Sequence, residues 1–136
     1  MNSSVSVAKI AELLDLKNFT DEIDLKKRKI TTTDINRPAL QLTGYFEHFE
    51  ESRVEIIGNV EYAYIQQMSD EEKRIRYDAF LKFDIPCVIF SRNLTPDPIF
   101  LKEALANHVP VLGTGRSTSE FTAELIYTLG EQLAPC

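Results

Sequence analysis

Ile85-Pro-Cys-Val-Ile-Phe90 is an unbroken apolar run near the middle of the chain. Its last four residues, Cys87 to Phe90, predict a strand that is apolar on both faces. Continuous apolar strands are typical of parallel sheets that helices cover on both sides. The run therefore predicts a buried strand within an α/β domain.

Strand and helix signals alternate around this run, from Val54 to the C-terminal end. Two further apolar strands are predicted at residues 54–57 and 110–112. Apolar residues at helical spacing predict a helix after each strand, with two helices in succession after the first. The predicted helix starts lie near Val60, Ser69, Thr95 and Ser117. We expect one domain, residues 1–136, with a small, largely parallel sheet flanked by helices.

The first third of the chain has weaker signals. Ser6 is a plausible N-cap for a short amphipathic helix, and the β-branched stretch 29–33 predicts a strand after a loop at 18–24. Pro38 predicts the first position of a helical turn that Gly44 ends. In the later helix that starts at Ser69, we expect Ile75 to face inward.

Composition indicates a soluble domain without a broad basic surface. The 136 residues are 43% hydrophobic, and 21 acidic against 15 basic residues give a net charge of -6. This charge disfavours nucleic acid and anionic membranes as partners, and we interpret the one basic run, 26–29, as a solvated flank. Cys87 in an apolar run and a second, terminal cysteine form no disulfide framework, so we expect a cytoplasmic protein.

The strongest candidate for ligand chemistry is the segment 112–119, Leu-Gly-Thr-Gly-Arg-Ser-Thr-Ser. A strand, two glycines, an arginine and hydroxyls before a helix could hold an anion. The candidate residues here are Arg116, Ser117, Thr118 and Ser119. The alternative is an ordinary capped helix start, because the glycine spacing is not that of a phosphate loop.

Two other arginines are candidates for binding a phosphate or carboxylate. Arg37 precedes the rigid Pro38, and Arg92 follows a strand. The alternative for Arg37 is an ion pair with a nearby acid. Neither His48 nor His108 lies in a ligand or catalytic pattern, and no metal site or catalytic set is predicted.

Nearly the whole chain resembles the N-terminal domain of HPr kinase/phosphorylase. The resemblance begins at residues 31–46, Thr-Thr-Thr-Asp-Ile-Asn-Arg-Pro-Ala-Leu-Gln-Leu-Thr-Gly-Tyr-Phe, and continues through 86–92, 110–112, 117–119 and 133–135. The signature residues, which we expect to be structural, are Asp34, Arg37, Pro38, Gly44, Tyr45, Arg53 and Gly58.

The resemblance implies a parent enzyme that is hexameric and uses ATP and Mg²⁺ to phosphorylate a seryl residue of the phosphocarrier protein HPr. Inorganic phosphate reverses that reaction, and the enzyme serves carbon catabolite regulation. The catalytic residues of the family belong to a following kinase domain, which this sequence lacks, so none is carried over and no cofactor is expected here. The resemblance also implies a fold similar to the N-terminal domain of Mur ligases.

Two functions follow as hypotheses. The first is a non-catalytic domain that serves assembly or regulation of the parent enzyme, with Tyr45, Phe46 and Phe49 as either a contact patch or internal packing. The second is a sensor of a phosphorylated metabolite that uses the three arginines and the helix start at Ser117. A stand-alone enzyme is a weaker third, because no nucleophile, base or metal site is found.

Overall fold

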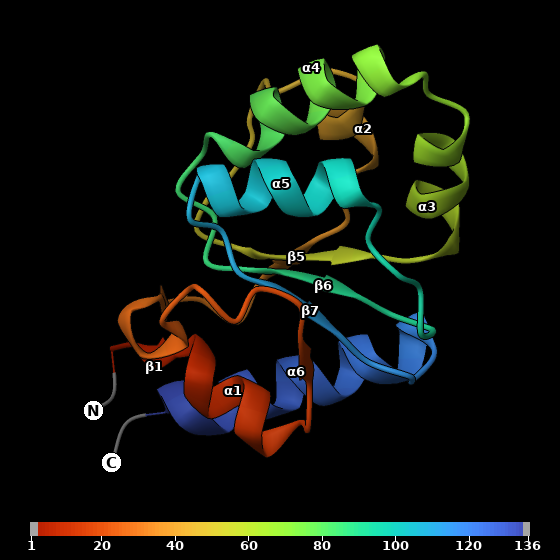
Figure 1. The fold of residues 1–136 in the computed structure, drawn as a ribbon. Coiled ribbons are helices and arrows are strands. Elements are labelled where there is room, and N and C mark those ends of the chain that lie inside the picture. The colour runs from red at the N-terminus through yellow and green to blue at the C-terminus, as the bar shows by residue number, and fades with distance from the viewer. Residues whose placement is uncertain (1–2, 135–136) are drawn as a thin grey trace.

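The computed structural model describes residues 3–134 and has a five-stranded, mostly parallel sheet at its centre (Figure 1). In spatial order its strands are β2 (Lys17–Asn18), β7 (Val111–Gly113), β6 (Val88–Phe90), β5 (Val54–Ile57) and β4 (Ile35–Asn36). Strands β4 to β7 run parallel, and β2 pairs antiparallel with β7. A separate antiparallel pair joins β1 (Val5–Ser6) to β3 (Lys29–Ile30). The predicted α/β class and largely parallel sheet are confirmed.

Helices cover both faces of the sheet (Figure 1). One face carries α2 (Ala39–Leu42), α3 (Asn59–Gln66), α4 (Asp70–Leu81) and α5 (Pro98–Ala106). The other face carries α1 (Val7–Leu13) and α6 (Thr118–Leu133), and a 3₁₀ turn spans Leu25–Lys27. The parallel strands follow one another across the sheet in chain order, so right-handed crossovers place all the connecting helices on one face. Helix α6, which follows the last strand, is free to cover the other face.

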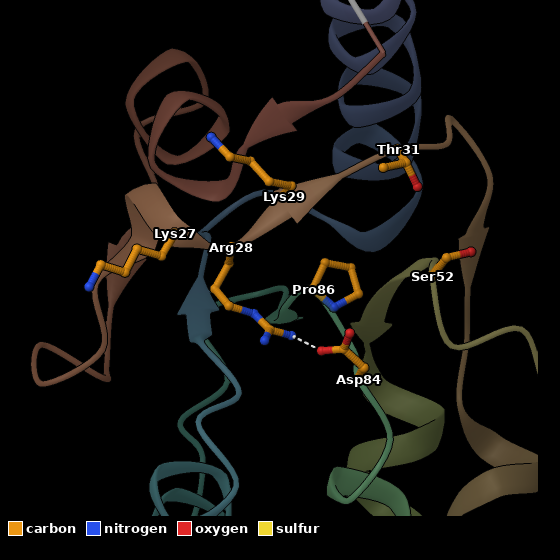
Figure 2. A pocket seen from close by; sticks show the side chains of 7 residues that line it. All are labelled: Lys27, Arg28, Lys29, Thr31, Ser52, Asp84 and Pro86. Atoms are coloured by element: carbon orange, nitrogen blue, oxygen red, sulfur yellow. Dashed lines mark ion pairs between the residues drawn. The ribbon is translucent and has the colours of Figure 1, made fainter.

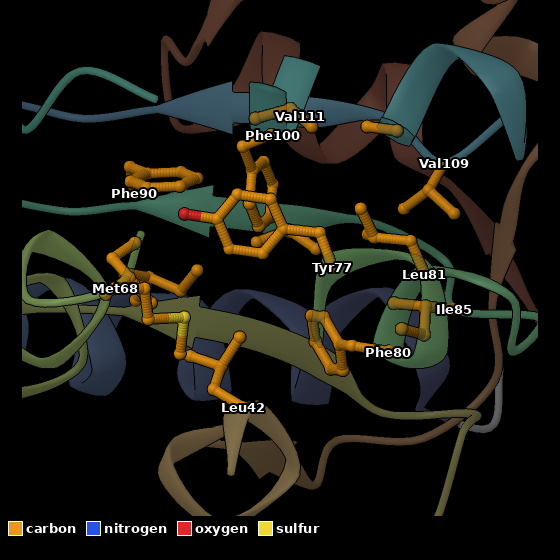
Figure 3. Close-up of a cluster of buried hydrophobic side chains, with 14 residues drawn as sticks. Leu42, Met68, Tyr77, Phe80, Leu81, Ile85, Phe90, Phe100, Val109 and Val111 are labelled. Atoms are coloured by element: carbon orange, nitrogen blue, oxygen red, sulfur yellow. The ribbon is translucent and has the colours of Figure 1, made fainter. Parts of the chain in front are cut away.

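The central strand β6 supplies side chains to two separate cores. Phe90 packs on the α4 and α5 side, with its ring centroid 5.2 Å from that of Phe100, and Tyr77 lies 4.9 Å beyond Phe100 (Figure 3). Ile89 and Cys87 belong to the core beneath α1 and α6. This arrangement confirms a strand that is apolar on both faces. Burial raises the pKa of Cys87 to about 12, so its thiol stays protonated.

Side-chain caps start several helices where the sequence predicts them. Ser6, Ser69 and Ser117 each accept a hydrogen bond from the backbone N–H three residues later, at 3.0, 3.2 and 3.3 Å. Gly44 follows α2 with φ of +95°, a conformation that favours glycine. The sequence also predicts that Pro135 ends the last helix, and this residue lies outside the described residues.

Several details of the sequence prediction are wrong. Helix α5 begins at Pro98 rather than at Thr95, because Asp97 is the residue whose side chain caps it, through the N–H of Phe100. The strand predicted at 29–33 ends at Ile30, and β2 includes Asn18, the first residue of the predicted loop. No strand is predicted at β4. Ile75 is 59% exposed, because the inward stripe of α4 passes through Tyr77, Phe80 and Leu81 instead.

Candidate functional site

A cleft of about 670 Å³ lies at the carboxyl ends of strands β5 and β6. Its wall residues include Arg37, Asn59, Val60, Arg92, Thr118 and Ser119. Asn59 and Val60 open α3, and Thr118 and Ser119 open α6. Two helices on opposite faces of the sheet therefore start at one opening, which we call the α3–α6 cleft. Ligands in open α/β sheets bind outside the carboxyl ends of the strands, which is where this cleft lies.

Arg37 is held in the cleft by a buried acid. Its Nη2 atom donates to Oε1 of Glu61 at 2.7 Å, and the same oxygen accepts the backbone N–H of Gly58 at 2.8 Å. The side chain of Glu61 is 3% exposed and that of Arg37 is 38% exposed. The pairing that was the alternative for Arg37 is therefore present, yet the guanidinium keeps further N–H donors toward solvent.

Gly58 is required by the close approach of two side chains. A Cβ atom at this position would lie 2.6 Å from Oγ1 of Thr118 and 2.8 Å from Nη2 of Arg37. Its φ of -112° is open to any residue, so the constraint is space and not backbone conformation. Thr118 in turn shares a hydrogen bond of 2.7 Å with the hydroxyl of the buried Ser91. These contacts join β5, β6 and α6 at the base of the cleft.

Arg92 enters the cleft from the loop after β6. Arg92 and Asn93 both have positive φ, 59° and 57°, which is uncommon for residues other than glycine. The loop is tied to the start of α6, because the N–H of Arg92 donates to the carbonyl of Arg116 at 2.9 Å. Within residues 3–134, Arg92 forms no ion pair, and its side chain is exposed.

Arg116 does not line the cleft. Its Nη1 atom donates to the carbonyl of Leu14 at 2.9 Å, and its Nε atom lies 3.1 Å from Oε1 of Glu124. Ser117 uses its hydroxyl to cap α6. Of the six candidate anion-binding residues, the structure brings together Arg37, Arg92, Thr118 and Ser119 and leaves Arg116 and Ser117 outside that lining.

The remaining signature residues lie around α2 and the strands beside it. Asp34 and Arg53 directly precede the neighbouring strands β4 and β5. Oδ2 of Asp34 lies 4.0 Å from Nη2 of Arg53. Pro38 precedes α2 and Gly44 follows it. Tyr45 is 47% exposed and its hydroxyl donates to Glu47 at 3.2 Å.

The neighbouring aromatic residues form internal packing. Phe46 and Phe49 have ring centroids 4.9 and 5.0 Å from that of Phe83, and both pack against the core beneath α4. Of the three aromatic residues considered as a contact patch, Tyr45 alone has a side chain that is largely outside this packing. The internal-packing alternative therefore applies to Phe46 and Phe49.

Sequence reasoning missed two buried carboxyl groups. Glu61 was identifiable as the third residue of a helix that follows a glycine, where a carboxylate reaches back to a free N–H. Glu55 lies in an apolar strand, fully buried, and its Oε1 accepts from Nδ2 of Asn36 at 2.7 Å. Oε2 has no partner among the described residues. Burial raises the pKa of Glu55 to about 8, so the carboxyl is mainly protonated at neutral pH.

A second, smaller pocket of about 310 Å³ lies beside the basic run (Figure 2). Arg28 points into it and pairs with Asp84 at 3.0 Å, whereas Lys27 and Lys29 point away from Arg28 (Figure 2). Arg28 also donates to the carbonyl of Ile85. The positive charges of this run therefore do not converge, and its one inward arginine is already paired.

Residues 3–134 contain no cluster of histidine, cysteine and acidic side chains that could hold a metal ion. His48 is a surface residue, 89% exposed, and pairs at 3.7 Å with Glu47. No helix in the described part of the chain combines the length and hydropathy needed to span a membrane.

Comparison with known proteins gives one family. The family model described as "HPr Serine kinase N terminus" matches residues 5–129. Curated relatives named HPr kinase/phosphorylase are 42% identical over 97% of this chain in Lachnoclostridium phytofermentans and 39% identical over 96% in Caldicellulosiruptor bescii. A relative of the same name from Latilactobacillus sakei is 34% identical over 98% of the chain. The match covers 42 to 43% of each relative, so the chain spans less than half of their length.

The fold also occurs among solved structures. The crystal structure of the CBS and DRTGG domains of the regulatory region of Clostridium perfringens pyrophosphatase, complexed with the activator diadenosine tetraphosphate, aligns with a TM-score of 0.60. The alignment covers 89% of this chain and 45% of that one, at 16% sequence identity. At this identity the likeness concerns the fold alone.

Proposed function

We propose, from the premise that this chain belongs to the family of HPr serine kinase N-terminal domains, that it is the non-catalytic N-terminal domain of an HPr kinase/phosphorylase. The observation that carries the proposal is the match of 97% of this chain to 43% of a relative with that name.

The rest of the proposal concerns the parent enzyme. A kinase domain that follows this one uses ATP and Mg²⁺ to phosphorylate a seryl residue of HPr, and it reverses the reaction with inorganic phosphate. The assembly is a hexamer in the cytoplasm, and neither nucleic acid nor a membrane is a partner. This domain serves assembly or regulation, and the acidic net charge of -6 is in keeping with a protein partner rather than a nucleic acid.

The direct test uses a fusion protein in which this chain is followed by the C-terminal portion of the Lachnoclostridium phytofermentans relative. With HPr, ATP and Mg²⁺, we expect phosphorylation of HPr by the fusion and none by the chain alone. The same C-terminal portion without this chain is the matched control, assayed for activity and for assembly by light scattering. A chain that phosphorylates HPr by itself would contradict the proposal. A C-terminal portion that keeps full activity and assembly alone would contradict a role of this domain in assembly.

A second candidate is a sensor of a phosphorylated metabolite within the same enzyme. The observation that favours it is the α3–α6 cleft, to which Arg37 and Arg92 both contribute. The expected likeness to the N-terminal domain of Mur ligases points the same way and remains a prediction. The two candidates are compatible, because a regulatory domain can act by binding a ligand.

A further inference from the structure

We propose that the α3–α6 cleft binds a small phosphate ester, with its phosphoryl group between Arg37 and Arg92 and its apolar part against Val60 and Ile126. This inference deepens the sensor candidate and rests on it. It assigns the ligand class and a role to each wall of the cleft.

The first argument is the charge of the cleft. Two guanidinium groups from separate segments, one before α2 and one after β6, line the same opening in a protein of net charge -6. Glu61 balances one of the two, and Arg92 has no acidic partner among residues 3–134. One positive charge is therefore left over at the cleft, and guanidinium groups bind phosphate through paired N–H donors.

The second argument is that Arg37 is already oriented. Its Nη2 atom is fixed by Glu61, whose own position is fixed by the N–H of Gly58. A guanidinium has five N–H donors, so this ion pair leaves others for a ligand. An arginine held in place before binding loses less side-chain entropy when the ligand arrives.

The third argument is the backbone that surrounds the arginines. The first two residues of α3, Asn59 and Val60, and the first two of α6, Thr118 and Ser119, all line the cleft. N–H groups in the first turn of a helix have no partner within the helix, and the helix dipole favours an anion there. Two such turns supplement the arginines.

The apolar walls indicate the rest of the ligand. Val60 is 70% exposed and Ile126 is 43% exposed, and both line the cleft together with Ala123. These side chains come from α3 and α6. A flat apolar group attached to the phosphate would cover exposed aliphatic surface on both helices.

The test is a titration of the ¹⁵N-labelled chain by NMR, with phenyl phosphate and inorganic phosphate as probes. We expect saturable shifts at Asn59, Val60, Thr118 and Ser119 and tighter binding of phenyl phosphate. Arg92→Asn removes the charge while keeping a residue that tolerates positive φ, and it should weaken phenyl phosphate by about tenfold or more. Arg74→Asn, at an exposed position of α4 outside the cleft, is the matched control.

Two further variants make the result specific. Ser119→Asp adds a carboxylate at the start of α6, where it suits the helix but repels a phosphoryl group, so it should abolish binding in a folded protein. Ile126→Ser should weaken phenyl phosphate and leave inorganic phosphate unchanged. A phosphoserine peptide is titrated as a third probe. Absence of saturable shifts at millimolar probe, equal losses in Arg92→Asn and Arg74→Asn, or preference for the phosphoserine peptide over phenyl phosphate would each overturn the proposal. Failure of the fusion enzyme does not affect this assay, which uses the chain alone.

Discussion

Oε1 of Glu61 lies 2.7 Å from Nη2 of Arg37 and 2.8 Å from the backbone nitrogen of Gly58, so one buried oxygen holds both a side chain of the cleft and the start of α3. Arg37 comes from the segment between β4 and α2, and Glu61 comes from the first turn of α3. The pair therefore joins two segments that are 24 residues apart in the chain.

Replacing Glu61 by Gln should destabilise the fold. The change removes the charge that balances Arg37 and weakens the bond to Gly58, while the site stays buried. Breaking a largely buried ion pair by neutralising one partner costs about 2–4 kcal/mol of unfolding free energy. Urea denaturation measures this loss. Glu50→Gln is the control, because Glu50 is exposed and forms no ion pair within residues 3–134, and it should change stability by less than about 0.5 kcal/mol. Equal stability of the two variants would contradict the role assigned to Glu61.

Two glycines should respond in opposite ways to replacement by alanine. At Gly58 the new Cβ meets Thr118 and Arg37, so we expect a loss of about 1–3 kcal/mol. Gly130 is an exposed position within α6, where a Cβ atom would meet no heavy atom within 4 Å apart from its chain neighbours and the adjacent backbone of the helix. Alanine should therefore stabilise by about 0.5–1 kcal/mol. Thermal unfolding of both variants compares the two effects. A neutral Gly58→Ala would show that the contacts at the base of the cleft relax freely.

Glu55 should make stability fall as pH rises. Burial raises the pKa of this carboxyl from 4.5 to about 8 in the folded protein, so the folded state holds a proton that the unfolded state releases. The contribution of Glu55 to the free energy of unfolding is fully present below about pH 4.5 and is lost as the pH rises from there to about 8. Over this range the free energy of unfolding falls by up to about 1.4 kcal/mol per pH unit. Urea denaturation from pH 5 to 8 measures the slope. Glu55→Gln, which stays neutral and similar in shape, should flatten it, and an unchanged slope in that variant would assign the effect to other groups.

Arg116→Ala should reduce stability without weakening phosphate binding. Its guanidinium bonds the carbonyl at the end of α1 and pairs with Glu124 of α6, and both contacts lie outside the cleft. Loss of a charged hydrogen bond of this kind costs about 1–2 kcal/mol. Denaturation tests the first part and the phenyl phosphate titration the second, with Arg74→Ala as control. Loss of binding in a folded Arg116→Ala protein would return this residue to the ligand site.

The elements that the sequence predicts well are those with strong local signals. β6 is a continuous apolar stretch, and β5 and β7 are mainly apolar, with Glu55 the charged exception in β5. The serine caps at 6, 69 and 117 mark helix starts whose hydrogen bonds are local. β2 and β4 were missed because each has two residues and exists only through its pairing with β7 or β5. A strand of two residues is too short to show the alternation of apolar and polar residues that predicts strands, and the pairing of an edge strand is set by its neighbour.

The sequence identified single residues of the candidate site, but it did not show which of them lie together in the folded protein. Arginine and hydroxyl side chains near strand ends pointed to Arg37, Arg92 and the start of α6, and the same reasoning selected Arg116. Which way an arginine points depends on the acceptors around it, and those of Arg116 belong to α1 and α6. Glu61, which orients Arg37, lies 24 residues away in the chain.

The sequence by itself determined the α/β class and the family, because apolar periodicity, caps and an ordered set of signature residues are all local properties of the chain. The tertiary structure alone decided that α3 and α6 start at the same cleft and that Arg37 and Arg92 line it while Arg116 does not. Right-handed crossovers place α2 to α5 on one face of the sheet and leave the other face to α1 and α6. Long-range pairing then selects the orientation of each charged side chain.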